Sequence, residues 1–264
     1  MNSSTQPIRS ARTTILAALA PAVLALTALV LVPSPAAAAP TLTIKTRALP
    51  IPGFPHTGDI LGAGAMIIGE GTLSGTEYAG DPPPLTQIKV FAPAGAELHP
   101  QGFATCPPEN LERTGPEACS KHSVAGPQTS ALGVVSFASE RVPETVSVQP
   151  FFAPGGGVEA FVKGATPVSV ELLVQGRFTS AAPPFGFEGV AEVPLIETLP
   201  GAPDASFLHG SVGVGAAYRK HGRTFSYITL PKTCSKGGWP LKVQMSFYGG
   251  ATAEASYDMP CPKA

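Results

Sequence analysis

Hydrophobic and polar residues alternate along short stretches of the chain, and turn-forming residues separate these stretches. The segment VSVELLVQGRF (168–178) shows the pattern plainly, because Val168, Val170, Leu172 and Val174 fall on one face of an extended strand. No amphipathic stretch of about a dozen residues at helical period occurs outside the N-terminal region. The 29 glycines and 30 prolines, scattered along the chain, also disfavour long helices.

The alternating segments predict about 12 β-strands. We expect them at residues 41–47, 65–75, 86–93, 131–139, 145–153, 158–162, 168–178, 186–195, 206–218, 224–230, 241–249 and 252–259. Strands that follow one another without intervening helices are typical of an antiparallel sandwich or barrel. About 12 strands exceed one immunoglobulin unit, so we predict an all-β fold, a large antiparallel β-sandwich of jelly-roll size.

The N-terminal region has the three parts of a secretory signal. Arg9 and Arg12 precede an apolar, helix-forming run over residues 15–32, and an alanine-rich tract with Ala36 and Ala38 follows. Small side chains one and three positions before the cut are what the signal peptidase requires, so we expect cleavage after Ala38. An uncleaved membrane anchor is the alternative, because the apolar run is nearly as long as the roughly 20 residues that span a bilayer.

Residues 1–38 are therefore expected to form the signal peptide, and residues 39–264 the β-sandwich domain. The stretch VPLIETLPGAPDAS (193–206) is the place where a linker would divide this domain into two halves.

The charge of the chain excludes some partners. Loss of Arg9 and Arg12 from the 17 basic residues leaves 15 against 18 acidic residues, a net charge of −3. The sequence has no basic patch of five or more residues, so nucleic-acid binding lacks its electrostatic driving force. We predict no nucleic-acid partner, and no membrane contact once the signal is removed.

The four cysteines, Cys106, Cys119, Cys234 and Cys261, all lie in the exported part, where thiols are oxidised. Four cysteines allow three pairings, and proximity in the sequence favours Cys106–Cys119 and Cys234–Cys261. A zinc site that uses Cys119 and His122 would need thiolates kept reduced. We therefore expect two disulfides.

The sequence contains no recognisable catalytic or metal-binding motif. The nearest match to a serine-hydrolase elbow, HGSVG at residues 209–213, lacks the first glycine and falls within a strand pattern. A glycosidase needs two carboxylates across one cleft. Four glutamates on predicted strands are candidates: Glu70, Glu171, Glu188 and Glu192. Same-face pairs on antiparallel strands usually face water, so we predict no catalytic, cofactor-binding or metal-binding residues.

Three aromatic residues near the C-terminus are candidates for ligand stacking. Trp239, Tyr248 and Tyr257 lie in or beside the last two predicted strands. Rings in this arrangement can form a platform for a sugar, although aromatic residues in strands more often belong to the core.

A run in the first half of the mature chain resembles a pattern seen in other exported proteins. It reads PPPLTQIKVFAPAGAELHPQGFATC and continues to CSKHSVAG. Its order of P-x-L, strand, P-x-G, two cysteines and S-x-x-G is similar to a family of secreted, disulfide-containing, β-rich proteins of high-GC Gram-positive bacteria. The resemblance covers most of residues 60–261 and implies export, with no assigned activity and no catalytic residues. Ser120 departs from the pattern, which often has proline after the second cysteine.

We therefore predict an exported, non-enzymatic protein of the cell envelope or extracellular space that acts as a binding or structural module. Its rigid scaffold would present loops to an envelope polymer or a protein partner. One alternative is an extracellular carbohydrate-active hydrolase, which requires a deep cleft with two converging carboxylates. The other is a lipid-binding carrier, which requires a large apolar cavity.

Overall fold

The computed structural model describes residues 39–51, 61–137, 140–165, 169–199, 202–203 and 205–261. The predicted signal peptide, residues 1–38, lies outside the described residues. Residues from Ala37 to Ala264 group into one compact unit. Among the described residues, no helix is long and apolar enough to cross a membrane.

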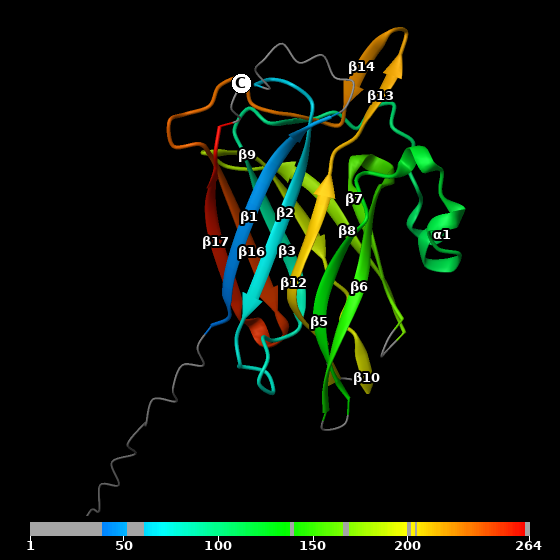
Figure 1. Cartoon of the computed structure of the whole chain (residues 1–264), viewed down its shortest axis with the longest axis vertical. Helices are drawn as coiled ribbons and strands as arrows, with labels where there is room; N and C mark the ends of the chain where they lie inside the picture. The colour runs from blue at the N-terminus through cyan, green and yellow to red at the C-terminus, as the bar shows by residue number, and fades with distance from the viewer. Residues whose placement is uncertain are drawn as a thin grey trace, which may run out of the picture. The chain divides into compact units, whose positions relative to one another are not determined.

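Within the described ranges, eleven strands form one continuous sheet (Figure 1). In chain order they are β1 (Thr41–Pro50), β2 (Ala65–Ser74), β3 (Leu85–Pro93), β5 (Thr129–Phe137), β6 (Glu140–Phe152), β7 (Val158–Gly164), β8 (Val170–Ser180), β9 (Phe185–Glu192), β12 (Ala205–Val214), β16 (Trp239–Phe247) and β17 (Thr252–Met259). Their order across the sheet is β1-β2-β12-β5-β6-β7-β8-β9-β3-β16-β17, and the paired neighbours are antiparallel. The predicted all-β, antiparallel fold is confirmed.

The sheet curls until its two edge strands, β1 and β17, contact each other, so it is nearly closed. Its inner face carries the main core. Along β16 every second residue is buried, from Trp239 to Phe247. The last three of these, beginning at Val243, pack in one cluster with Leu42 and Ile44 of β1, whereas Trp239 belongs to a second cluster with Met259 of β17. Each fully buried large apolar side chain contributes about 1.5–3 kcal/mol. This alternation is the pattern from which the strands were predicted.

The outer face of β6, β7 and β8 is covered as well, by the segment that holds the first disulfide. Helix α1 (Pro108–Arg113) begins at a proline, whose fixed φ suits the first helical position, and ends before Gly115, which has a φ of 94°. Its Leu111 packs with Cys106 on Phe151, Phe161 and Leu173. Residue 173 is therefore buried on the face opposite to Val170 of the same strand.

Both predicted disulfides are present. Cys106 and Cys119 are bonded with a Cα–Cα distance of 5.4 Å, and Cys234 and Cys261 with one of 5.8 Å. The first holds α1 and the short 3₁₀ turns η1 (Pro116–Ala118) and η2 (Lys121–Ser123) as one cover over the sheet. The second joins the loop before β16 to the residues after β17.

Three small two-stranded sheets complete the fold: β4 (Glu97–Leu98) with β15 (Ile228–Thr229), β10 (Glu197–Leu199) with β11 (Ala202–Pro203), and β13 (Ala217–Lys220) with β14 (Arg223–Ser226). The sequence predicted one long strand over 206–218. Instead β12 ends at Val214, and the chain leaves the main sheet at Gly215. The φ of Gly215 is 146°, a value that residues with a side chain rarely adopt. The tight turn between β13 and β14 includes Gly222, whose φ is 76°.

Candidate functional site

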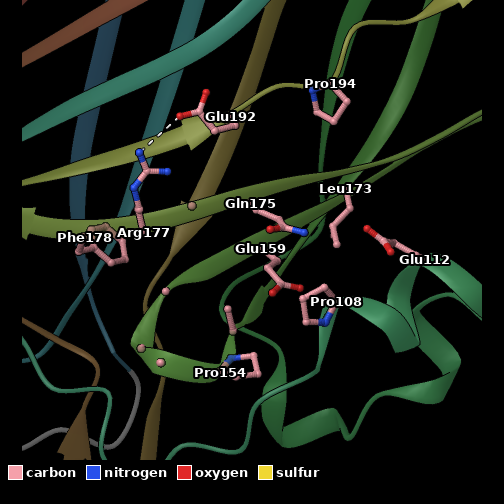
Figure 2. A pocket seen from close by; sticks show the side chains of 15 residues that line it. Pro108, Glu112, Pro154, Glu159, Leu173, Gln175, Arg177, Phe178, Glu192 and Pro194 are labelled. Carbon is pink, nitrogen blue, oxygen red and sulfur yellow. Dashed lines mark ion pairs between the residues drawn. The ribbon is translucent and has the colours of Figure 1, made fainter.

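A cleft of about 510 Å³ lies on the outer face of the sheet, between α1 and the strands β7, β8 and β9 (Figure 2). Its lining includes Pro108 and Glu112, which are one helical turn apart on α1. The 3₁₀ turn η3 (Pro154–Gly156), which connects β6 to β7, forms another part of its wall.

Strand register brings three polar residues of the cleft into one row. Glu159 of β7 is directly opposite Gln175 of β8, and Gln175 is directly opposite Glu192 of β9. Opposite residues of antiparallel strands project from the same face with Cβ atoms about 5 Å apart. Figure 2 shows Glu159 and Gln175 side by side, with Pro108 and Glu112 of α1 facing them. The row therefore forms the polar floor of the cleft.

Glu159 is the residue with the most unusual environment. Only 3% of its surface is exposed, and its Oε2 atom is buried with no hydrogen-bond partner among the described residues. Burial, together with the negative charges of Glu109 and Glu112, raises the pKa of the Glu159 carboxyl to about 7. None of the ion pairs between described residues includes Glu159.

Among the described residues that line the cleft, Arg177 is the one cation, and it is already paired. Arg177 Nη2 lies 3.5 Å from Glu192 Oε1, and both side chains are more than half exposed. Gln87 of β3 also donates from Nε2 to Glu192 Oε1, at 3.0 Å. Exposed pairs of this kind are weak, but they compensate the charge of Glu192 locally. The carboxyl groups of Glu109, Glu112 and Glu159 are left as an excess of acid beside α1.

The glycine turn at the wall of the cleft is fixed by the core. Tyr227, which is fully buried, donates its hydroxyl to the carbonyl oxygen of Gly156 at 2.7 Å. Burial raises the pKa of Tyr227, so its hydroxyl stays a neutral donor. A Cβ at Gly157 would lie 2.2 Å from the carbonyl oxygen of Gly176, so this position admits no side chain without separating β7 from β8.

The structure does not bring the three predicted stacking residues together. Trp239 is 3% exposed, belongs to the inner core and donates its Nε1 to Thr233 O at 2.9 Å. Tyr257 lies on the same inner face, opposite Leu241. Tyr248 follows the other end of β16, where it is 42% exposed and in edge contact with Tyr78.

Of the four strand glutamates considered from the sequence, only Glu192 lines the cleft. Glu171 forms an ion pair with Lys163, and Glu188 accepts a hydrogen bond from Thr179 at 3.2 Å. Glu70 lies on β2, opposite Lys45 of β1. No group of three histidine, cysteine, aspartate or glutamate residues in the described part of the chain is arranged to hold a metal ion.

Comparison with protein-family models, with curated proteins and with solved structures finds no match to this chain.

Proposed function

We propose that this chain is an exported, non-enzymatic binding protein of the cell envelope or extracellular space, and that it holds a ligand with a cationic nitrogen in the cleft beside α1. Two disulfides and the secretory pattern of residues 1–38 support the extracytoplasmic location. The sequence resemblance to secreted proteins of high-GC Gram-positive bacteria supports the same location.

The buried carboxyl of Glu159 carries the proposal for the cleft. A carboxylate that loses its hydration must gain hydrogen bonds or an opposite charge, and otherwise it costs stability. Here the charges that act on Glu159, those of Glu109 and Glu112, have the same sign as its own. An ammonium or guanidinium group on a ligand would supply the missing partner to Glu159, and Gln175 beside it can bind neighbouring hydroxyl or amide groups.

Matched pairs of probes test this proposal. We expect glucosamine to bind more tightly than N-acetylglucosamine, and 1-pentylamine more tightly than 1-pentanol, in calorimetric titrations at neutral pH. Glu159→Gln should remove the preference for the amine in each pair. Equal binding of charged and uncharged probes, or none, would overturn the cleft proposal.

A second candidate is a carbohydrate-active hydrolase. The pKa of Glu159, near 7, keeps this carboxyl protonated at mildly acidic pH, as a general acid requires, and Glu112 and Glu192 line the same cleft. Release of reducing sugar from envelope polysaccharide, abolished by Glu159→Gln, would favour the hydrolase. Binding without turnover would favour the non-enzymatic module.

A further inference from the structure

The hairpin formed by β13 and β14 differs in charge from the rest of the mature chain. It extends beyond the main sheet, at the end opposite to the one where β5 ends (Figure 1). Over residues 217–226 it carries Arg219, Lys220, His221 and Arg223, and no acidic residue. The mature chain as a whole has more acidic than basic residues. The fold therefore places a local positive charge at one projecting tip.

Register sets two cations and two aromatic rings on one face of this hairpin. Tyr218 is directly opposite Phe225, and Lys220 is directly opposite Arg223. Alternation along each strand puts these four side chains on the same face. The rings of Tyr218 and Phe225 are stacked, with centroids 5.1 Å apart and planes 14° apart. Phe225 is nevertheless 41% exposed, so its free side is available for contact.

The hairpin is held in a defined position. Its turn uses positive φ at both His221 (50°) and Gly222 (76°), which is the geometry of a tight two-residue hairpin loop. At its base, the Tyr218 hydroxyl donates to Gln101 O at 3.0 Å, and the Tyr218 ring meets Phe103 edge-on at 4.9 Å. The tip is thus presented by a rigid base and need not be ordered on binding.

The cations of the tip are available to an external partner. The ion pairs found between described residues do not include Arg219, Lys220 or Arg223, and all three are exposed. Beside the base, Lys121 and His122 of η2 line a second hollow together with Tyr218. The positive surface therefore continues from the tip toward the cover over the sheet.

We propose that the β13–β14 hairpin is a docking element for an anionic phospholipid bilayer. Arg219, Lys220 and Arg223 bind lipid phosphates, and the Phe225 ring enters the interface beside them. A hydrated phosphate polymer would satisfy the cations, but it offers no apolar layer for the exposed ring. The combination of both features on one hairpin therefore favours the bilayer. This inference does not depend on the ligand of the cleft.

The expectation of no membrane contact was based on the absence of a long basic run in the sequence. Three permanent cations give only weak, reversible attachment, of the order of fivefold in partition coefficient for each cation. A count of basic residues in the sequence does not show that the pairing of β13 with β14 places these charges beside the exposed ring of Phe225.

Co-sedimentation of the mature protein with vesicles tests the proposal. We expect binding to vesicles of phosphatidylcholine and phosphatidylglycerol in equal parts, little binding to phosphatidylcholine alone, and weaker binding as salt rises. The triple variant Arg219→Ser, Lys220→Ser, Arg223→Ser should lose about a hundredfold of the partition coefficient. A control variant loses the same charge at three exposed positions elsewhere: Lys45→Ser, Arg47→Ser and Lys236→Ser. It should bind anionic vesicles almost as the wild type does.

Phe225→Ser distinguishes a bilayer from a soluble polyanion. We expect it to weaken vesicle binding severalfold while it leaves any binding to inorganic polyphosphate unchanged. Unaltered emission from the buried Trp239 checks that each variant is folded. The proposal is overturned if the wild type ignores anionic vesicles, if the triple variant binds like its control, or if Phe225→Ser has no effect on vesicle binding.

Discussion

Arg141 of β6 binds Asp81, in the loop between β2 and β3, through two contacts. The Arg141 Nε atom donates to Asp81 Oδ2, and the Nη2 atom contacts Oδ1. Asp81 is only 5% exposed, whereas the Arg141 side chain is about half exposed. The pair links two parts of the chain that are 60 residues apart, and the arginine is what permits the aspartate to be buried with its charge.

Removal of the arginine should therefore cost far more than the loss of a surface ion pair. We expect Arg141→Ala to lower the free energy of unfolding by about 2–3 kcal/mol, because it leaves a buried carboxylate without its partner. Urea unfolding followed by Trp239 emission measures the change. Lys163→Ala is a matched control, since it breaks a pair with Glu171 in which both side chains are exposed, and it should cost less than about 1 kcal/mol. Equal losses in the two variants would contradict this account of Asp81.

Glu159 should give the stability of the protein a distinct pH dependence. In the folded state its pKa is about 7, against an ordinary value of 4.5. Between these two pH values the folded state holds the proton more tightly than the unfolded state does, so the free energy of unfolding falls as pH rises through this window. The contribution of Glu159 is fully present below pH 4.5 and is lost above pH 7, a total of about 3 kcal/mol.

Glu159→Gln tests this directly. The variant has no proton to lose at this position. We therefore expect its free energy of unfolding, minus that of the wild type, to rise by about 3 kcal/mol between pH 4 and pH 8. Urea midpoints across this pH range measure the effect. Glu171→Gln, at an exposed position of β8, is the control for the loss of one carboxyl group, and the decline in stability that Glu159 causes between pH 4.5 and 7 should persist in it. If the stability of the Glu159→Gln variant declines from pH 4.5 to 7 as steeply as that of the wild type, the assignment is refuted.

The strands were predictable because alternation is local, whereas their arrangement in one sheet is not. The alternating residues from Trp239 to Phe247 identify β16 without any tertiary information. Its neighbour β3 lies about 150 residues earlier in the chain, and nothing local specifies that pairing. The single continuous sheet, nearly closed by the contact of β1 and β17, depends on several such distant pairings.

The cleft was missed for the same reason. Glu159 lies between Val158 and Ala160, so the sequence pattern suggests a polar residue on the solvent face of a strand. It is buried because α1, some 50 residues earlier, covers that face. Glu112 lies in a short helical turn with no motif around it. Of the four glutamates that the strand pattern offered as candidate site residues, Glu192 is the one that lines the cleft.

The first disulfide should matter for the cleft as well as for stability. Cys106 and Cys119 are 13 positions apart, and closing a loop of this length stabilises the folded state by about 3 kcal/mol in the chain-entropy account. We expect the double variant Cys106→Ser, Cys119→Ser to lose about that much, and also to lose amine binding, because α1 is no longer fixed over Glu159. The double variant Cys234→Ser, Cys261→Ser should lose a similar free energy of unfolding while it keeps the cleft ligand. Calorimetric titration of both variants measures binding, and urea unfolding measures stability. Loss of binding in both variants would show that the first disulfide affects the cleft only through global stability.

Gly157 tests whether the close approach of two backbones shapes the cleft. Its backbone angles, φ −80° and ψ −172°, suit any residue, so the cost of Gly157→Ala is purely steric. The new Cβ would lie 2.2 Å from the carbonyl oxygen of Gly176, which is backbone in the paired strand and cannot rotate away. We expect a loss of about 1–3 kcal/mol, seen as a fall of several degrees in Tm, together with weaker binding in the cleft that Gly157 lines. Gly237→Ala adds the same methyl group where nothing lies within 4 Å, and it should change the free energy of unfolding by less than about 0.5 kcal/mol. If the two variants melt at the same temperature, the strands β7 and β8 are not held as closely as this register requires.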